Sequence, residues 1–253
     1  GLLVPLLLGV LGWRGAFVAC GAFCVIFAIM LQPIRQRFDS DRNPGQSLKP
    51  GYIWQNLRQV MGSPSLRDLA FGMFCFVGLQ GLFGSYFVTY IAENMGRPLE
   101  DANHFFSIAM TTAIGARILW GWVGSALMPA RRVVAYLAVV MVVAAVGMGS
   151  IQPEWSDMAI IGVAILFCIS AISWHGLMMA EIARLSPEGQ VGPVTGACLA
   201  FAGAGMMSYP MIYALLLEAT GDPALGFFIA ALPAAVMAVK LYRPPKHVEG
   251  AAV

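Results

Sequence analysis

Residues 105–127 read FFSIAMTTAIGARILWGWVGSAL, an apolar stretch whose only charge is Arg117. As a helix, the stretch is long enough to cross a hydrocarbon layer about 30 Å thick. Arg117 follows His104 by thirteen residues, which corresponds to about 20 Å of helical rise. A cation at that depth costs about 2.5–3.5 kcal/mol to insert. Since Gly121 and Gly124 share its helical face, we expect that face to turn toward a polar cavity and not toward lipid.

The composition of the whole chain is typical of a polytopic membrane protein. Of its 253 residues, 59% are hydrophobic and only 11% are charged, whereas a soluble domain carries about a quarter charged residues. The fold class predicted is therefore an all-α, polytopic transmembrane helix bundle. No phosphate loop, catalytic triad or metal-ligand cluster is present in the sequence, so we expect no enzyme activity, no cofactor and no metal. A net charge of +2 does not indicate a nucleic-acid partner.

Alternating apolar and polar segments predict seven full spans and one partial span. Residues 1–32 are predicted to hold the end of one helix, a turn at Gly12–Arg14 and a full span. The other expected parts are a polar linker at 33–67, a six-helix bundle at 68–243 and a tail at 244–253. The spans expected in the bundle are 68–92, 105–127, 133–151, 158–180, 192–217 and 224–242. Because the chain opens inside an apolar run without Met, we expect it to be a fragment that lacks earlier helices.

The basic residues predict the orientation of the spans in the membrane. If the 33–67 linker lies inside, alternation places twelve lysines and arginines inside and only Arg14 and Arg97 outside. Positive charge favours the cytoplasmic side. We therefore expect a multi-pass protein of the plasma membrane (the inner membrane in bacteria), with a cytoplasmic C-terminus.

After the linker, the spans repeat a pattern of three. Spans 68–92 and 158–180 are rich in glycine or serine, the next span of each triplet has a small-residue face, and the third has few polar side chains. Two successive triplets cross the membrane in opposite directions, because three is odd. This arrangement predicts the inverted three-helix repeats of secondary transporters.

Four motifs resemble the major facilitator superfamily. Gly12–Phe17 resembles the turn between its fifth and sixth helices. Gly121–Arg132 resembles the second-half copy of its cytoplasmic loop motif, with Ser125 in place of the aspartate. Ala180–Arg184 and Gly192–Gly196 resemble the link between helices ten and eleven.

The resemblance implies a chain that runs from the end of helix five to helix twelve of a twelve-helix transporter. It also implies a cytoplasmic gate or scaffold made of Ser125, Arg131, Arg132, Glu181 and Arg184. The antiporter signature of helix five is not recognisable at the start of the chain, so a symporter or uniporter is expected.

Arg117 has no carboxylate near its depth in any predicted span. Its partner is an anionic substrate, water or a structural partner in the missing helices. The first alternative predicts that the substrate is a small organic anion such as a carboxylate.

The other candidate substrate-binding residues are polar side chains inside three spans. They are Gln80, Ser85, Tyr86 and Thr89 in a span that we expect glycine to break, Ser173, Trp174 and His175, and Ser208 and Tyr209. Each set has a structural alternative: polar contacts between helices, a packed histidine, or a helix kink. A histidine titrates near neutral pH, so a coupled proton is a further candidate partner.

These observations predict a permease for secondary active transport of a small solute by alternating access, with an organic anion as the expected substrate. The expected partners are that solute, the lipid bilayer and the missing N-terminal helices. The alternative is a non-transporting membrane sensor or scaffold with the same fold.

Overall fold

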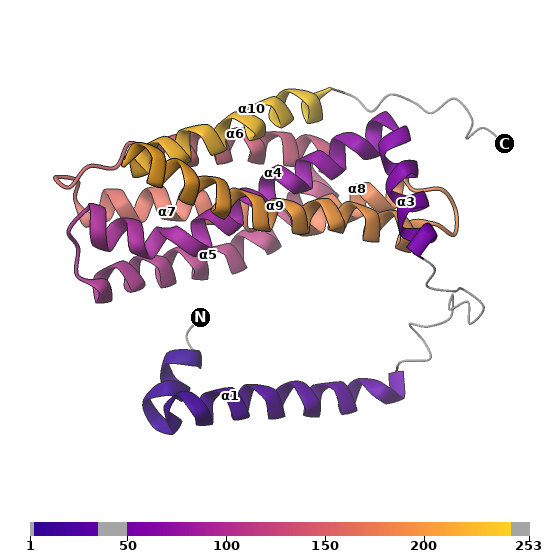
Figure 1. Ribbon diagram of the computed structural model, residues 1–253. Helices are drawn as coiled ribbons and strands as arrows, with labels where there is room; N and C mark the ends of the chain where they lie inside the picture. Colours follow the sequence, from indigo (N-terminus) through magenta and orange to yellow (C-terminus); the bar gives the residue numbers. More distant parts are fainter. Residues whose placement is uncertain (1–2, 35–49, 244–253) are drawn as a thin grey trace. The chain divides into compact units, whose positions relative to one another are not determined.

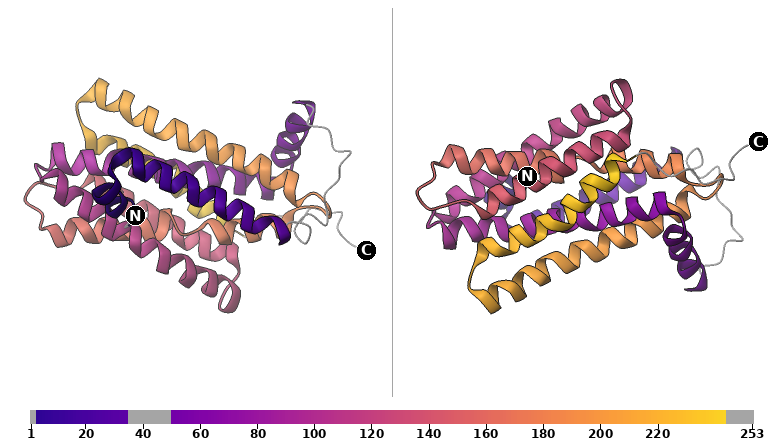
Figure 2. Two further views of the ribbon diagram at one scale, coloured as in Figure 1. Left: turned by 90° about the horizontal axis from the view of Figure 1, so that it is seen from below. Right: turned by 90° about the horizontal axis from the view of Figure 1, so that it is seen from above.

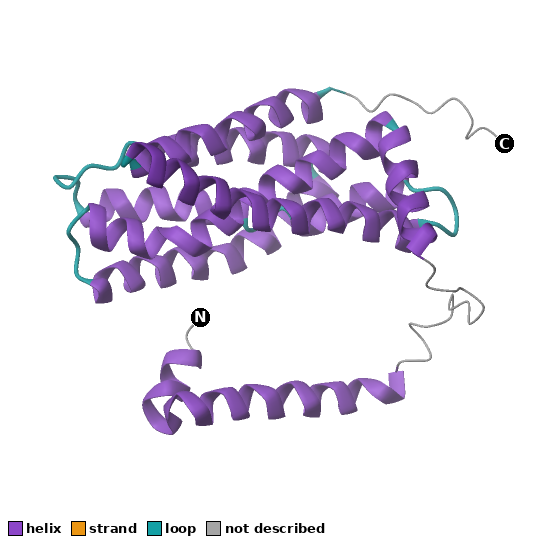
Figure 3. Ribbon diagram, viewed as in Figure 1, coloured by secondary structure: helices purple, strands orange, loops and turns teal. Residues whose placement is uncertain are grey.

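The computed structural model describes residues 3–34 and 50–243, and these form two units, Gly1–Pro50 and Gly51–Val253. All regular structure in the described residues is helical (Figures 1 and 3). Within these described residues, seven helical segments are long and apolar enough to cross a membrane. The predicted all-α class and the predicted seven spans are therefore confirmed.

The first unit contains one long helix, α1 (Leu3–Leu31), which is followed by a short 3₁₀ turn at Gln32–Ile34. The expected break occurs at Gly12, whose φ of 65° lies in the left-handed region that favours glycine. Trp13 and Arg14 are helical again, so the break takes one residue and not the predicted three. Residues 35–49 of the predicted linker and the tail at 244–253 lie outside the described residues.

The second unit is a bundle that begins with a short amphipathic helix. Its helices are α3 (Pro50–Gly62), α4 (Pro64–Thr89), a π-helical turn η2 (Tyr90–Asn94), α5 (Leu99–Ala126), α6 (Ala130–Gly149), α7 (Asp157–Ala171), α8 (His175–Leu185), α9 (Val191–Thr220) and α10 (Pro223–Tyr242). α3 occupies the second part of the predicted linker, and its Gln59 side chain donates to that of Gln190, just before α9, over 2.5 Å.

The helix pairing has the exchange symmetry that an inverted repeat requires. The most extensive contacts join α4 to α9, α5 to α7, and α6 to α10 (Figure 2). In an inverted repeat, α4 corresponds to α7–α8, α5 to α9, and α6 to α10. This correspondence converts the α4–α9 pair into the α5–α7 pair, and it leaves the α6–α10 pair unchanged. The two predicted triplets therefore occupy equivalent positions in the bundle.

The expected glycine break in the span 68–92 is wrong. α4 is continuous to Thr89, and its glycines admit a neighbouring helix. A Cβ on Gly78 would meet the Tyr209 ring of α9, and one on Gly81 would meet the backbone of Met206. Small residues allow membrane helices to approach closely without losing backbone hydrogen bonds.

The broken helix is the predicted span 158–180, which the sequence analysis treated as continuous. α7 ends at Ala171 and α8 begins at His175. Residues 172–174 between them lie halfway along the span, at the depth where transporters of this architecture bind their substrates. The break, and not the glycine-rich helix, therefore positions the candidate site.

Candidate functional site

The break between α7 and α8 is held by side chains that bind backbone carbonyls across the helix interface. Breaking a helix frees carbonyl groups, which must find other donors inside a membrane. Trp120 of α5 donates from Nε1 to the Ile169 carbonyl over 2.8 Å. In the reverse direction, the Ser173 hydroxyl donates to the Ala113 carbonyl of α5 over 3.2 Å. These bonds tie the break to the helix that carries Arg117.

Arg117 donates from Nε to the Ile172 carbonyl over 3.2 Å. This backbone partner was not predicted from the sequence, for which an anionic substrate, water and the missing helices were the alternatives. The side chain is exposed on the surface of its unit. Among the described residues, no hydrogen bond or ion pair engages its two terminal nitrogens. The guanidinium is therefore oriented at one edge, while the fork of terminal N–H groups remains available to an oxyanion.

His175 shares the carbonyl that Arg117 binds. Its Nδ1 lies 3.1 Å from the Ile172 oxygen, and because a carbonyl only accepts, Nδ1 is assigned the proton. The imidazole ring stacks on Trp174 at 4.1 Å between centroids. Two nitrogen donors from different helices therefore converge on one oxygen at the break.

Trp174 and Ser173 support this arrangement from inside the bundle. Trp174 is fully buried, donates to the Ala171 carbonyl over 2.7 Å and packs edge-on against Phe76 of α4. Ser173 is 3% exposed. Both residues were predicted to bind substrate, but both are buried in the core of the bundle, whereas His175 is half-buried.

The N-terminus of α8 adds partial positive charge at the same point. The helix begins at His175 without a side-chain cap, so its first backbone N–H groups have no intrahelical acceptor. Gly176 is exposed, and a Cβ there would meet nothing within 4 Å. A helix N-terminus attracts anions. Beside Arg117, it makes the break an attractive place for a small anion.

The predicted polar residues of α4 lie along that helix, and among the described residues no hydrogen bond joins them to Arg117. Gln80 is half-buried, and its Oε1 has no hydrogen-bond partner in the described structure. Ser85 and Thr89 are exposed. The Tyr86 ring packs at a tilt of 42° against the Tyr213 ring of α9, with 4.4 Å between the ring centroids. A substrate-binding role for these residues stays a prediction.

The two predicted residues of α9 differ in exposure. Ser208 is half-buried and bonds the Ala204 carbonyl of its own helix over 2.7 Å. Tyr209 is 7% exposed, and its hydroxyl lies near the Cys75 thiol without a hydrogen-bond partner that meets ordinary geometry. Their binding role also stays a prediction.

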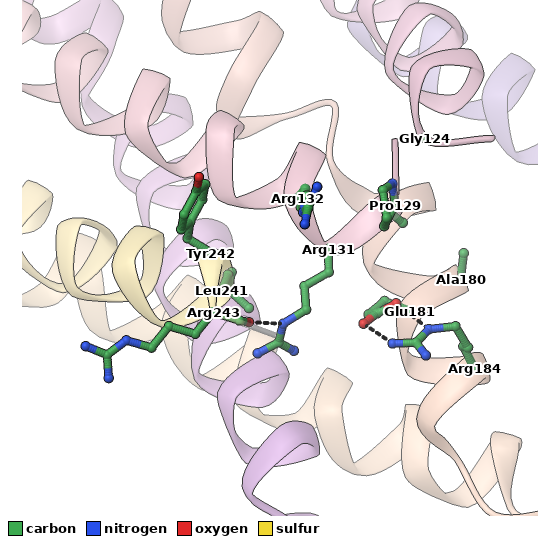
Figure 4. Close-up of a pocket in the computed structure, with 11 residues that line it drawn as sticks. Gly124, Pro129, Arg131, Arg132, Ala180, Glu181, Arg184, Leu241, Tyr242 and Arg243 are labelled. Atoms are coloured by element: carbon green, nitrogen blue, oxygen red, sulfur yellow. Dashed lines mark hydrogen bonds and ion pairs between the residues drawn. The ribbon is translucent and has the colours of Figure 1, made fainter. Parts of the chain in front are cut away.

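The ends of α5, α8 and α10 and the start of α6 form one end of the bundle, which we call the basic end. Four of the five predicted gate or scaffold residues line a pocket there (Figure 4): Arg131, Arg132, Glu181 and Arg184. Glu181 is buried and receives two bonds from Arg184, over 2.9 and 2.7 Å. This confirms that the pair forms, whereas its gating role stays a prediction. Ser125 is exposed and bonds only the Trp122 carbonyl.

Arg131 is buried at the basic end, and Arg132 beside it is exposed. Arg131 lies 3.8 Å from the Asp68 carboxylate, which also lies 3.8 Å from Lys240. Asp68 and Lys240 were not among the gate or scaffold residues predicted from the sequence. The signal available was that Asp68 is the only acid in the first half of its helix.

Comparison with known proteins adds a family and two distant relatives. The profile of the Major Facilitator Superfamily matches residues 1–180. Two curated sequences, both named "Probable nitrate/nitrite transporter NarK2", come from Mycobacterium tuberculosis strains CDC 1551 / Oshkosh and ATCC 25618 / H37Rv. Each is 30% identical over 142 residues, which are 56% of this chain and 34% of the relative. The chain thus matches about a third of the length of these relatives.

Proposed function

The chain belongs to the major facilitator superfamily, and from that premise we propose that it transports a small planar oxyanion, with nitrate and nitrite as the first candidates. Membership and the distant relatives support transmembrane transport in general. The identity of the substrate rests on one observation. Arg117 is bonded at Nε to the Ile172 carbonyl at a helix break, while no described residue bonds its terminal nitrogens.

The cost of placing a cation at the depth of Arg117 in the bilayer favours an anionic substrate. A guanidinium in a bilayer needs a partner that offsets its desolvation, and the carbonyl of Ile172 carries only a partial charge. A planar oxyanion can accept two parallel N–H bonds from the free fork, a geometry that lysine cannot copy. The N-terminus of α8 lies beside the fork and favours the same charge.

Nitrate and nitrite come first because both relatives are named for them. The sequence analysis expected a small organic anion. Formate and acetate remain the second candidates, because a carboxylate presents the same pair of coplanar oxygens to Arg117.

In the proposed transport cycle, the anion binds at the break while the two halves of the transporter rock about it. His175 shares the Ile172 carbonyl with Arg117, so a proton on its second ring nitrogen would add positive charge beside the anion. His175 is accordingly our candidate for a coupled proton. We further propose that the basic end faces the cytoplasm of the plasma membrane, since positive charge accumulates on that side.

Uptake measurements test the proposal. The protein carrying this sequence is expressed in a host that lacks nitrate uptake, and labelled nitrate is followed together with the amount of protein in the membrane. Arg117→Lys keeps the charge but loses the fork, and Arg117→Gln loses both. Hydrogen bonds to charged groups contribute about 1.5–3 kcal/mol each, so we expect at least a tenfold loss of uptake in both variants.

The matched control is Arg58→Lys, because Arg58 is exposed on α3, away from the break. Excess nitrite or formate is expected to compete with nitrate, and a neutral sugar is not. Normal uptake by both Arg117 variants at equal membrane levels would refute a substrate contact. If the wild type is inserted and stabilised by nitrate but takes up none of these anions, the sensor alternative replaces transport.

A further inference from the structure

The basic end contains a cavity of about 610 Å³ between α5, α6, α8 and α10 (Figure 4). Its polar lining is dominated by four arginines, Arg131, Arg132, Arg184 and Arg243, against a single acid, Glu181. Arg184 already engages both oxygens of Glu181. The cavity therefore holds positive charge that its own lining does not neutralise.

Arg131 is the clearest sign that the positive charge of the cavity can accept an anionic ligand. The residue is only 5% exposed. Its Nε donates to the Arg243 carbonyl over 3.2 Å, and its Nη2 lies 3.8 Å from Asp68. Nη1 is buried and has no hydrogen-bond partner in the described structure. Figure 4 shows this guanidinium between Arg243 and the Glu181–Arg184 pair, directed into the space that the lining residues surround.

The nearest acid outside the cavity does not restore neutrality. Asp68 lines an adjoining pocket, where it lies between Arg131 and Lys240 at 3.8 Å from each. One carboxylate is thus shared by two cations. The start of α6 adds to the excess, because Ala130 lines the cavity and the first turn has no side-chain cap.

We propose that this cavity binds a phosphate group. A phosphate is tetrahedral and presents several charged acceptor oxygens, so it can accept bonds from more than one guanidinium and from backbone N–H groups together. A small monovalent anion such as nitrate would satisfy fewer of these donors. The site is separate from the break, since it uses different residues at the end of the bundle, and it does not depend on the transported substrate.

The surroundings of the cavity favour the phosphate of an anionic lipid over free phosphate. Tyr242 lines the cavity and packs edge-on against Tyr136 of α6, with 6.2 Å between the ring centroids. Both rings are exposed, at 61% and 49%. Exposed tyrosines at the end of membrane helices lie at the level of lipid headgroups, which would bring a headgroup phosphate to the mouth of the cavity.

The experiment compares purified protein in nanodiscs of phosphatidylcholine with and without phosphatidylglycerol, and follows thermal unfolding through tryptophan fluorescence. A second arm adds inorganic phosphate to the phosphatidylcholine nanodiscs, with chloride at equal ionic strength as its reference. We expect phosphatidylglycerol to raise the midpoint by several degrees. A rise with inorganic phosphate alone would identify free phosphate as the source of the same group.

Variants test whether the rise in midpoint caused by phosphatidylglycerol or by inorganic phosphate comes from binding in the cavity. Arg132→Gln changes an exposed lining residue that forms no ion pair within the described part of the chain. Arg58→Gln removes the same charge from α3, outside the cavity. Arg132→Gln is expected to weaken the apparent affinity at least tenfold, and Arg58→Gln less than twofold. Arg131→Lys retains the charge but not the fork, and it should weaken binding as well.

The proposal is overturned if neither phosphatidylglycerol nor inorganic phosphate shifts the midpoint of the wild type. It is equally overturned if Arg132→Gln and Arg58→Gln lose affinity alike, since the effect would then be general attraction to a basic surface.

Discussion

Replacing Gly205 with alanine is expected to separate the two helices that form the largest interface of the bundle. Gly205 lies on α9 and is buried against the backbone of Phe74 on α4, where an added Cβ would overlap the Phe74 carbonyl. A side chain could rotate out of the way, but a carbonyl inside a helix cannot. The methyl group can therefore be accommodated only if α4 and α9 move apart.

The net effect is the difference of two opposing contributions. Overpacking a tight contact costs about 1–3 kcal/mol, and the rigid backbone at this position argues for the upper end. Alanine is a better helix former than glycine by about 1 kcal/mol. The expected loss in free energy of unfolding is therefore about 2 kcal/mol. For a chain of this size, that corresponds to a fall in the melting temperature of about 4–8 °C.

Gly203→Ala is the matched control, because it makes the same change two residues away, at a position where a Cβ meets nothing within 4 Å. Its melting temperature should stay level or rise. The measurement is thermal unfolding of both purified variants in one detergent, followed by tryptophan fluorescence. Equal melting temperatures for the two variants would refute the argument that the approach of α4 to α9 requires glycine.

Two further predictions concern the break and the orientation. Ser173→Ala removes the bond to α5, which should cost about 0.6–1.7 kcal/mol and reduce nitrate uptake. Ser150→Ala, which removes only a bond to the Val146 carbonyl at the end of α6, should change neither property, and equal effects would show that Ser173 does not position the break. For the orientation, a cysteine at Ser150 should react with an impermeant thiol reagent in intact cells, and one at Leu127 only after permeabilisation; the reverse pattern would invert the proposed topology.

Much of the fold follows from local patterns in the sequence. The apolar runs predict every span, because hydrocarbon thickness requires a certain helix length whatever the neighbours are. The pair Glu181 and Arg184 is predicted as well, since residues three apart on a helix face one another. Arg117 is recognisable as a candidate because a charge inside an apolar span is costly wherever that span packs.

The break at residues 172–174 could not be predicted in the same way. No proline or glycine lies between α7 and α8. What holds the break are hydrogen bonds from α5 to carbonyls more than forty residues later in the chain, such as the bond from Trp120 to Ile169. The glycines of α4 illustrate the converse, since they suggested a break but serve a close contact with α9.

The sequence by itself thus determined that this is a membrane bundle with one costly cation in a span and basic residues gathered on one side. Only the tertiary structure decided what surrounds these charges. The Ile172 carbonyl orients the guanidinium of Arg117 by accepting a hydrogen bond from its Nε. Arg131 is buried between Asp68 and Arg243, and its Nη1 has no hydrogen-bond partner in the described structure. The physical reason is the separation along the chain of the residues that interact. Hydropathy and helical periodicity act between near neighbours in the chain, whereas the partners of a buried charge come from whichever helices the packing brings beside it.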